Sequence, residues 1–108
     1  MSLTRSFNAT VRARAMRDPA FRAALLREAV QSLLAGDLDT AKAALRAYIN
    51  ATIGFEKLAT ATGTPVKSLM RMFGPKGNPT AANLFAVIHV LQKKTRVRLE
   101  IRATASAA

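Results

Sequence analysis

The sequence predicts a mostly α-helical chain of about six helices, followed by one C-terminal β-strand. Three observations support this fold class. Half of the 108 residues are apolar and many of these are alanine, a composition that favours closely packed helices. Asp, Thr, Pro and Gly stand where helices would begin and end. Only the segment VRLEIRA alternates polar and apolar residues as a strand does. The length fits a single globular domain.

The N-terminal third contains two predicted helices. Thr4 can cap a first helix that extends to about Arg17. Asp18 and Pro19 suit the N-cap and the first position of a second helix, whose apolar residues recur every three to four positions until Gly36 ends it. We therefore expect residues 1–36 to form a helical extension that packs on the rest of the chain.

Residues 37–95 are expected to form the core of the domain. Asp37 caps a third helix, which ends before Gly54. Two short helices follow, at 55–62 and 65–73, and Gly63 marks the turn between them. The loop GPKGN is irregular by composition, and Pro79-Thr80 begins a longer helix over 81–94.

The predicted strand covers residues 96–103 and has one apolar face, formed by Val97, Leu99 and Ile101. A strand needs a second strand to pair with its backbone groups, and no other segment of this chain has a matching pattern. We therefore expect these three residues to form a dimer interface with a second copy. An alternative is that the strand adds to the edge of a partner protein's sheet.

The charge balance and the rare residue types narrow the possible functions. With 17 Lys and Arg against 6 Asp and Glu, the chain favours polyanions: nucleic acid, an anionic membrane surface or an acidic protein. There is no cysteine and one histidine, His89, so a metal site is not expected. No set of catalytic side chains and no nucleotide-binding glycine loop stands out, so we expect neither an enzyme nor a cofactor.

The location of the protein is expected to be cytoplasmic. The longest apolar run, LFAVIHVL, is shorter than the roughly 20 residues needed to span a bilayer. The first 17 residues contain four Arg and no acid, which resembles a mitochondrial presequence but fits a structural helix equally well.

The short helix at 65–73 has two unlike sides. Its apolar residues gather on one side, whereas Lys67 and Arg71 lie four residues apart on the other. Two short helices joined by a glycine turn, with cations outward on the second, match a helix-turn-helix. This motif places its second helix in the DNA major groove, where Lys or Arg can bind guanine. The plainer interpretation of the two cations is an ordinary solvated face.

The stretch LATATGTPVKSLMRMFGPKGNPTAANLFAVIHVL resembles the Cro/C1-type helix-turn-helix. More closely, the segments LTRSF, RDPAFRAALLREAVQSLLAGD, INATIGFEKLATATG, SLMRM and VRLEIRA are similar to those of the HigA-like addiction-module antidote proteins. The resemblance covers roughly residues 3 to 103. It implies a helical, usually dimeric DNA-binding protein, of antitoxin or prophage type, that represses its own operon and is encoded beside a RelE-like toxin.

The resemblance also implies roles for individual residues. Val66, Lys67 and Arg71 match base-facing positions, and Thr64, Ser68, Lys76 and Asn78 match the phosphate-contacting surroundings. Phe55 departs from the pattern, because many such proteins have a Gln or Ser there that grips phosphate.

Other functions remain open at this point. They are a stand-alone prophage-type repressor, a protein-interaction module that has lost DNA binding, as Phe55 suggests, and a basic RNA-binding or peripheral membrane protein.

Overall fold

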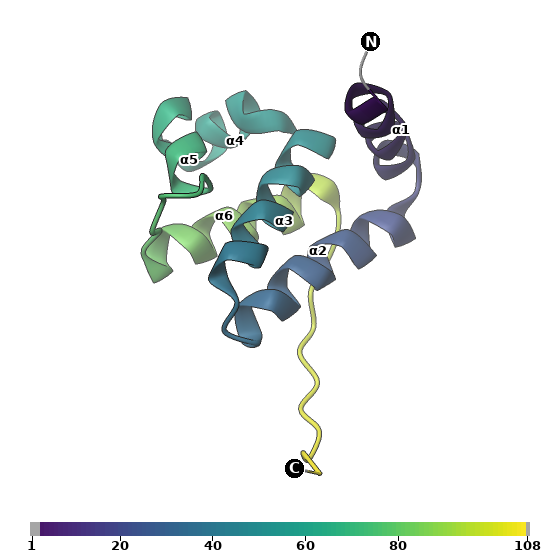
Figure 1. Ribbon diagram of the computed structural model, residues 1–108, viewed down its shortest axis with the longest axis vertical. Coiled ribbons are helices and arrows are strands. Elements are labelled where there is room, and N and C mark those ends of the chain that lie inside the picture. Colours follow the sequence, from purple (N-terminus) through teal and green to yellow (C-terminus); the bar gives the residue numbers. More distant parts are fainter. Residues whose placement is uncertain (1–2, 108) are drawn as a thin grey trace.

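Six α-helices make up most of the chain, as the sequence predicts (Figure 1). The computed structural model describes residues 3–107, with side chains from residue 7 onward. The helices are α1 (Leu3–Arg17), α2 (Pro19–Leu34), α3 (Leu38–Ala51), α4 (Gly54–Thr62), α5 (Val66–Met72) and α6 (Ala81–Thr95). The backbone of α1 begins before Thr4, and the cap predicted there concerns a side chain outside the described residues.

The helix ends follow from local side-chain chemistry. Asp18 accepts a hydrogen bond from the Phe21 N–H at 3.2 Å, which caps α2, and Asp37 caps α3 through the Thr40 N–H at 3.1 Å. The Thr40 hydroxyl also donates to Asp37, and these two bonds hold the pKa of the Asp37 carboxyl below its ordinary value. The predicted starts at Asp18 and Asp37 are therefore confirmed.

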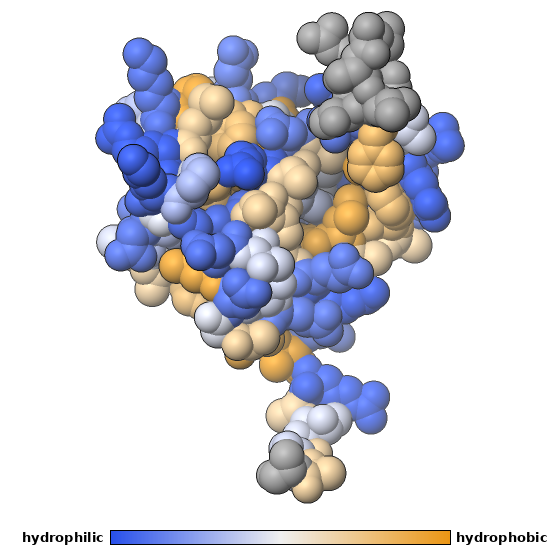
Figure 2. Space-filling view, in the orientation of Figure 1, coloured by the Kyte–Doolittle hydropathy of each residue, from blue (hydrophilic) through white to orange (hydrophobic). Residues whose placement is uncertain are grey.

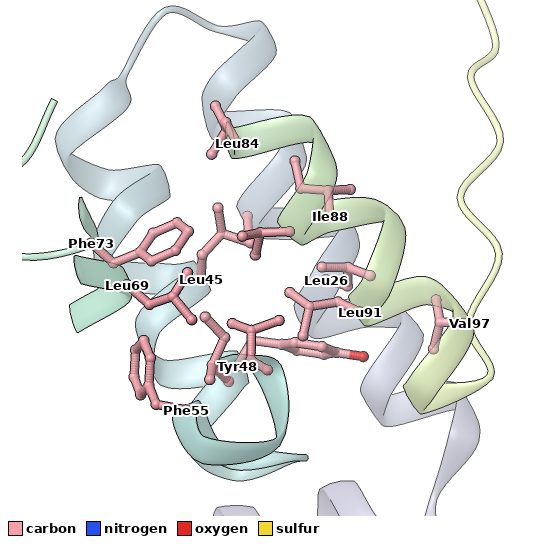
Figure 3. Close-up of a cluster of buried hydrophobic side chains, with 14 residues drawn as sticks. Leu26, Leu45, Tyr48, Phe55, Leu69, Phe73, Leu84, Ile88, Leu91 and Val97 are labelled. Atoms are coloured by element: carbon pink, nitrogen blue, oxygen red, sulfur yellow. The ribbon is translucent and has the colours of Figure 1, made fainter. Parts of the chain in front are cut away.

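The core lies around α3, which crosses the middle of the molecule (Figure 1). The helix α2 packs along α3 on one side, and α4, α5 and α6 gather on the other (Figure 1). The largest fully buried side chains come from five helices and the residue after α5; they are Leu26, Leu45, Tyr48, Ile49, Leu58, Leu69, Phe73, Val87 and Leu91. Because α5 is too short to be stable alone, its burial of Leu69 holds it in place (Figure 3).

A buried chain of hydrogen bonds ties α3 to the end of α6. The Thr95 hydroxyl donates to the Leu91 carbonyl at 2.6 Å, so the Tyr48 hydroxyl donates to Thr95 Oγ1, also at 2.6 Å. Burial raises the pKa of the Tyr48 phenol above its ordinary value, and the bond with Thr95 offsets part of this rise. Tyr48 is the one tyrosine of a chain without tryptophan, so its fluorescence reports on the core alone.

The C-terminal strand predicted over residues 96–103 does not form: residues 3–107 contain helices and irregular segments only (Figure 1). The segment leaves α6 in an extended path, and its first two apolar residues pack back on their own chain. Val97 is buried in the core and its N–H donates to the Gln92 carbonyl, whereas the Leu99 N–H donates to Gln92 Oε1 at 2.9 Å. Ile101 is 81% exposed. The strand does not form because a single chain offers no second strand to pair with its backbone N–H and C=O groups. The same argument led us to expect pairing with a second copy.

Candidate nucleic-acid interface

The turn between α4 and α5 is short and fixed by its own hydrogen bonds. Gly63 ends α4 in the left-handed region, at φ 72°, which glycine adopts without strain. Its N–H donates to the Ala59 carbonyl at 2.8 Å, and the Thr62 hydroxyl donates to the Leu58 carbonyl at 2.8 Å. Pro65 then precedes the first residue of α5. The two helices are therefore joined by a short glycine turn, as in a helix-turn-helix.

The helix α5 divides cleanly into an inner and an outer face. Leu69 is fully buried, together with Phe73 just beyond the helix, whereas Lys67 and Arg71 are both exposed. Met70 is 53% exposed. The outer face therefore presents two cations and a thioether to solvent. The helix cannot rotate about its axis without removing Leu69 from the core.

The other predicted site residues fall into two groups. Lys76 and Asn78 are exposed in the loop after α5. Thr64, Ser68 and Val66 are half-buried, and Val66 packs against the core cluster. Packing therefore already uses part of the Val66 side chain, although its position was predicted to face a base.

Phe55 does not form an aromatic surface. Its side chain is buried in the core cluster at the start of α4 (Figure 3). The phosphate-gripping side chain expected at this position is still missing, and the first turn of α4 also carries an exposed acid, Glu56. The start of α4 is therefore a weaker phosphate site than the resemblance implies.

Two cations of α3 support the loop after α5, and the sequence did not predict a role for either of them. Lys42 is only 4% exposed, and its Nζ lies 2.6 Å from the Gly77 carbonyl oxygen and 3.3 Å from that of Pro75. The Arg46 guanidinium donates to the Phe73 carbonyl at 2.9 Å. The sequence did hold a signal, because Lys42 interrupts an apolar stripe whose other members are Leu38, Leu45 and Ile49.

Charge is divided unevenly along the chain. Residues 57–99 carry eight Lys and Arg and no Asp or Glu, whereas residues 1–56 carry eight cations and five acids. Hydrophilic side chains project around α4 and α5 in the space-filling view (Figure 2). The acid-free stretch begins after Glu56 in α4 and includes α5, the loop after it and α6. Its positive charge favours a polyanion.

Elsewhere, a cleft of about 240 Å³ lies where the ends of α1, α3 and α6 meet, lined by Met16, Arg22, Thr52, Ile53, Lys94, Thr95 and Arg96. Arg22 donates there to three backbone carbonyls, so its charge is already engaged in holding helix ends. Within residues 3–107 no cluster of His, Cys, Asp or Glu has the size to bind a metal ion, and no helix is long and apolar enough to cross a membrane.

Comparison of the chain with models of protein families, with curated proteins and with solved structures gave no match.

Proposed function

We propose that this protein is a sequence-specific regulator that binds double-stranded DNA, with α5 lying in the major groove. The observation that carries the proposal is the outer face of α5. There Lys67 and Arg71 stand one turn apart, exposed, on a helix whose opposite face is locked into the core. Both side chains can form bidentate hydrogen bonds with guanine O6 and N7.

The first test replaces these two cations. Arg71→Ala is expected to cost about 1–3 kcal/mol of binding free energy and to relax the preference at one base pair, since a bidentate contact is lost. Lys67→Ala should act similarly at a neighbouring base pair. Fluorescence anisotropy on fragments of the protein's own promoter, compared with shuffled fragments, measures both effects.

The matched control removes the same charge elsewhere. Lys93→Ala and Lys94→Ala each delete one exposed cation from the last turn of α6, at the end of the chain's longest acid-free segment. They should weaken binding to promoter and shuffled fragments alike and leave base preference unchanged. If the Lys67/Arg71 double variant binds the promoter as the wild type does, α5 does not enter the groove.

In its finer form the proposal is the antitoxin of a type II toxin–antitoxin module that represses its own operon. This rests on the similarity of the segments RDPAFRAALLREAVQSLLAGD and INATIGFEKLATATG to antidote proteins. A RelE-like toxin encoded next to the gene would be its protein partner. Copurification of the toxin with this protein, together with repression of a reporter gene placed behind the promoter, would support the antitoxin function. Repression without a copurifying toxin would instead indicate a stand-alone repressor.

We further propose that the protein acts as a homodimer, joined through the segment after Val97. In an extended chain, successive N–H groups point to opposite edges. Because the N–H of Leu99 is bound to Gln92, those of Arg98, Glu100 and Arg102 face the other edge, where a second copy can pair with them. The exposed Ile101 would gain cover in such a pair.

Deleting residues 100–108 should therefore yield a monomer with much weaker promoter binding, because two-fold symmetry supplies both affinity and half-site spacing. The deletion spares Val97, which the core needs. Analytical ultracentrifugation at micromolar concentration measures the change. As a control, Ser106→Ala and Thr104→Ala in the full chain should leave the dimer intact. A truncated protein that still sediments as a dimer would place the interface elsewhere.

A further inference from the structure

The loop between α5 and α6 is held from its inner side by α3. The carbonyl oxygens of Phe73, Pro75 and Gly77 are bound by Arg46 and Lys42, while the side chains of 76 and 78 are exposed. The Nζ of Lys42 serves two of these oxygens at once. The buried cation thus fixes which way two peptide groups of the loop point.

The direction of these peptide groups decides where their N–H groups point. All peptide bonds described are trans, and in a trans peptide the C=O and the following N–H point in opposite directions. Because Pro75 O and Gly77 O point inward to Lys42, the N–H groups of Lys76 and Asn78 point outward. The loop therefore presents two backbone donors beside an exposed lysine side chain, an arrangement suited to a phosphate.

The loop is also tied to the end of α5. Gly77 lies so close to the helix that a Cβ atom would overlap the backbone oxygens of Arg71 and Met72. Its N–H donates to the Gly74 carbonyl at 3.0 Å and closes the turn. The two outward N–H groups therefore keep a fixed distance from the outer face of α5.

The hydrogen bonds that Lys42 makes with the loop have to offset the burial of its ammonium group. Burying an ammonium group is costly, and an apolar side chain of similar volume often gives equal or greater stability. The nearest carboxylate, that of Asp39, lies 3.6 Å away with its side chain 91% exposed, so it contributes little. What an apolar residue cannot do is hold the oxygens of Pro75 and Gly77 inward.

We propose that Lys42 is a positioning residue for phosphate binding: it aims the N–H groups of Lys76 and Asn78 at the DNA backbone without touching DNA itself. This inference rests on the proposed DNA-binding function. It assigns sequence-independent affinity to the loop and leaves base preference to α5.

The test is Lys42→Met, which keeps the length of the side chain and removes its donors. Affinity for promoter and shuffled DNA should fall together by about tenfold, the worth of one hydrogen bond to a charged group. The slope of log affinity against log salt should lose about one unit, as in Lys76→Ala. The Lys42→Met/Lys76→Ala double variant should bind DNA scarcely more weakly than the more affected single variant, since the N–H groups that Lys42 aims and the Lys76 side chain are proposed to hold the same phosphate.

Ile49→Val on α3 is the matched control for destabilisation. It removes a buried methyl group outside the loop and should lower stability while keeping the wild-type salt slope. A wild-type salt slope in Lys42→Met, or additive losses in the double variant, would overturn the positioning role.

A second measurement does not depend on DNA or on the folding of a variant. Titration of the wild type with inorganic phosphate, followed by amide NMR, should shift the N–H signals of Lys76 and Asn78 more than those of other loop residues. Unmoved signals at these two positions would overturn the inference. If the wild type shows no salt-sensitive binding to DNA, the proposed function fails, and the phosphate titration still decides whether the N–H groups of Lys76 and Asn78 form an anion site.

Discussion

Replacing Phe73 by alanine is expected to lower the free energy of unfolding by about 3–5 kcal/mol, as for other large buried aromatic residues. The side chain is fully buried between α3 and α5, near Leu45 and Leu69 (Figure 3). Collapse of the surrounding helices cannot fill the space that it leaves, because its neighbours already belong to a packed cluster. Chemical denaturation followed by Tyr48 fluorescence measures the loss.

The control is Phe85→Ala on α6, where the aromatic ring is 65% exposed. Its effect should stay within about 0.5 kcal/mol, as for surface substitutions generally. The loss at Phe73 is a large share of the roughly 5–15 kcal/mol that stabilises a typical domain, so the proposed DNA binding should weaken with it at physiological temperature. Equal effects at the two positions would mean that the end of α5 is not anchored in the core.

Replacing Arg22 by methionine is expected to cost about 2–4 kcal/mol, since one guanidinium serves three carbonyls at the ends of two helices. Its Nη1 lies 2.8 Å from Ala15 O and 3.2 Å from Met16 O, at the end of α1, and its Nε lies 3.1 Å from Thr95 O, at the end of α6. Methionine retains most of the aliphatic part of the arginine side chain, so the loss of stability reports on the three hydrogen bonds. Hydrogen exchange should show the amides of α1 opening before those of α3.

Arg27→Met removes a cation from an exposed position of the same helix and should leave both exchange and stability near wild type. Unchanged protection of α1 in the Arg22 variant would show that the N-terminal helix is held by its apolar contacts alone.

The helices could be predicted because their signals are local. Asp18, Asp37 and Gly63 act on groups within four residues, so a single chain read in order reveals them. The exposure of Lys67 and Arg71 likewise follows from helical period once Leu69 is placed inward.

The rest depended on contacts between distant segments. Lys42 and Arg22 bind backbone carbonyls. Because every residue has a backbone carbonyl, the residue types in the sequence do not indicate which carbonyls these two cations bind. Val97 joined the core of its own chain because Gln92 could satisfy the neighbouring backbone, which alternation alone does not reveal. The burial of Phe55 could not be predicted for the same reason, because the core cluster to which it belongs draws its members from several helices along the chain.

The division of α5 into two faces has a consequence for how such a protein can change over generations. Folding constrains Leu69 and the adjoining Phe73, whereas recognition would constrain Lys67, Met70 and Arg71, and the two sets share no residue. Substitutions on the outer face cost little stability. Under the proposed function, a duplicated copy of the gene would acquire a new operator by changing two or three codons, while the intermediate proteins still fold.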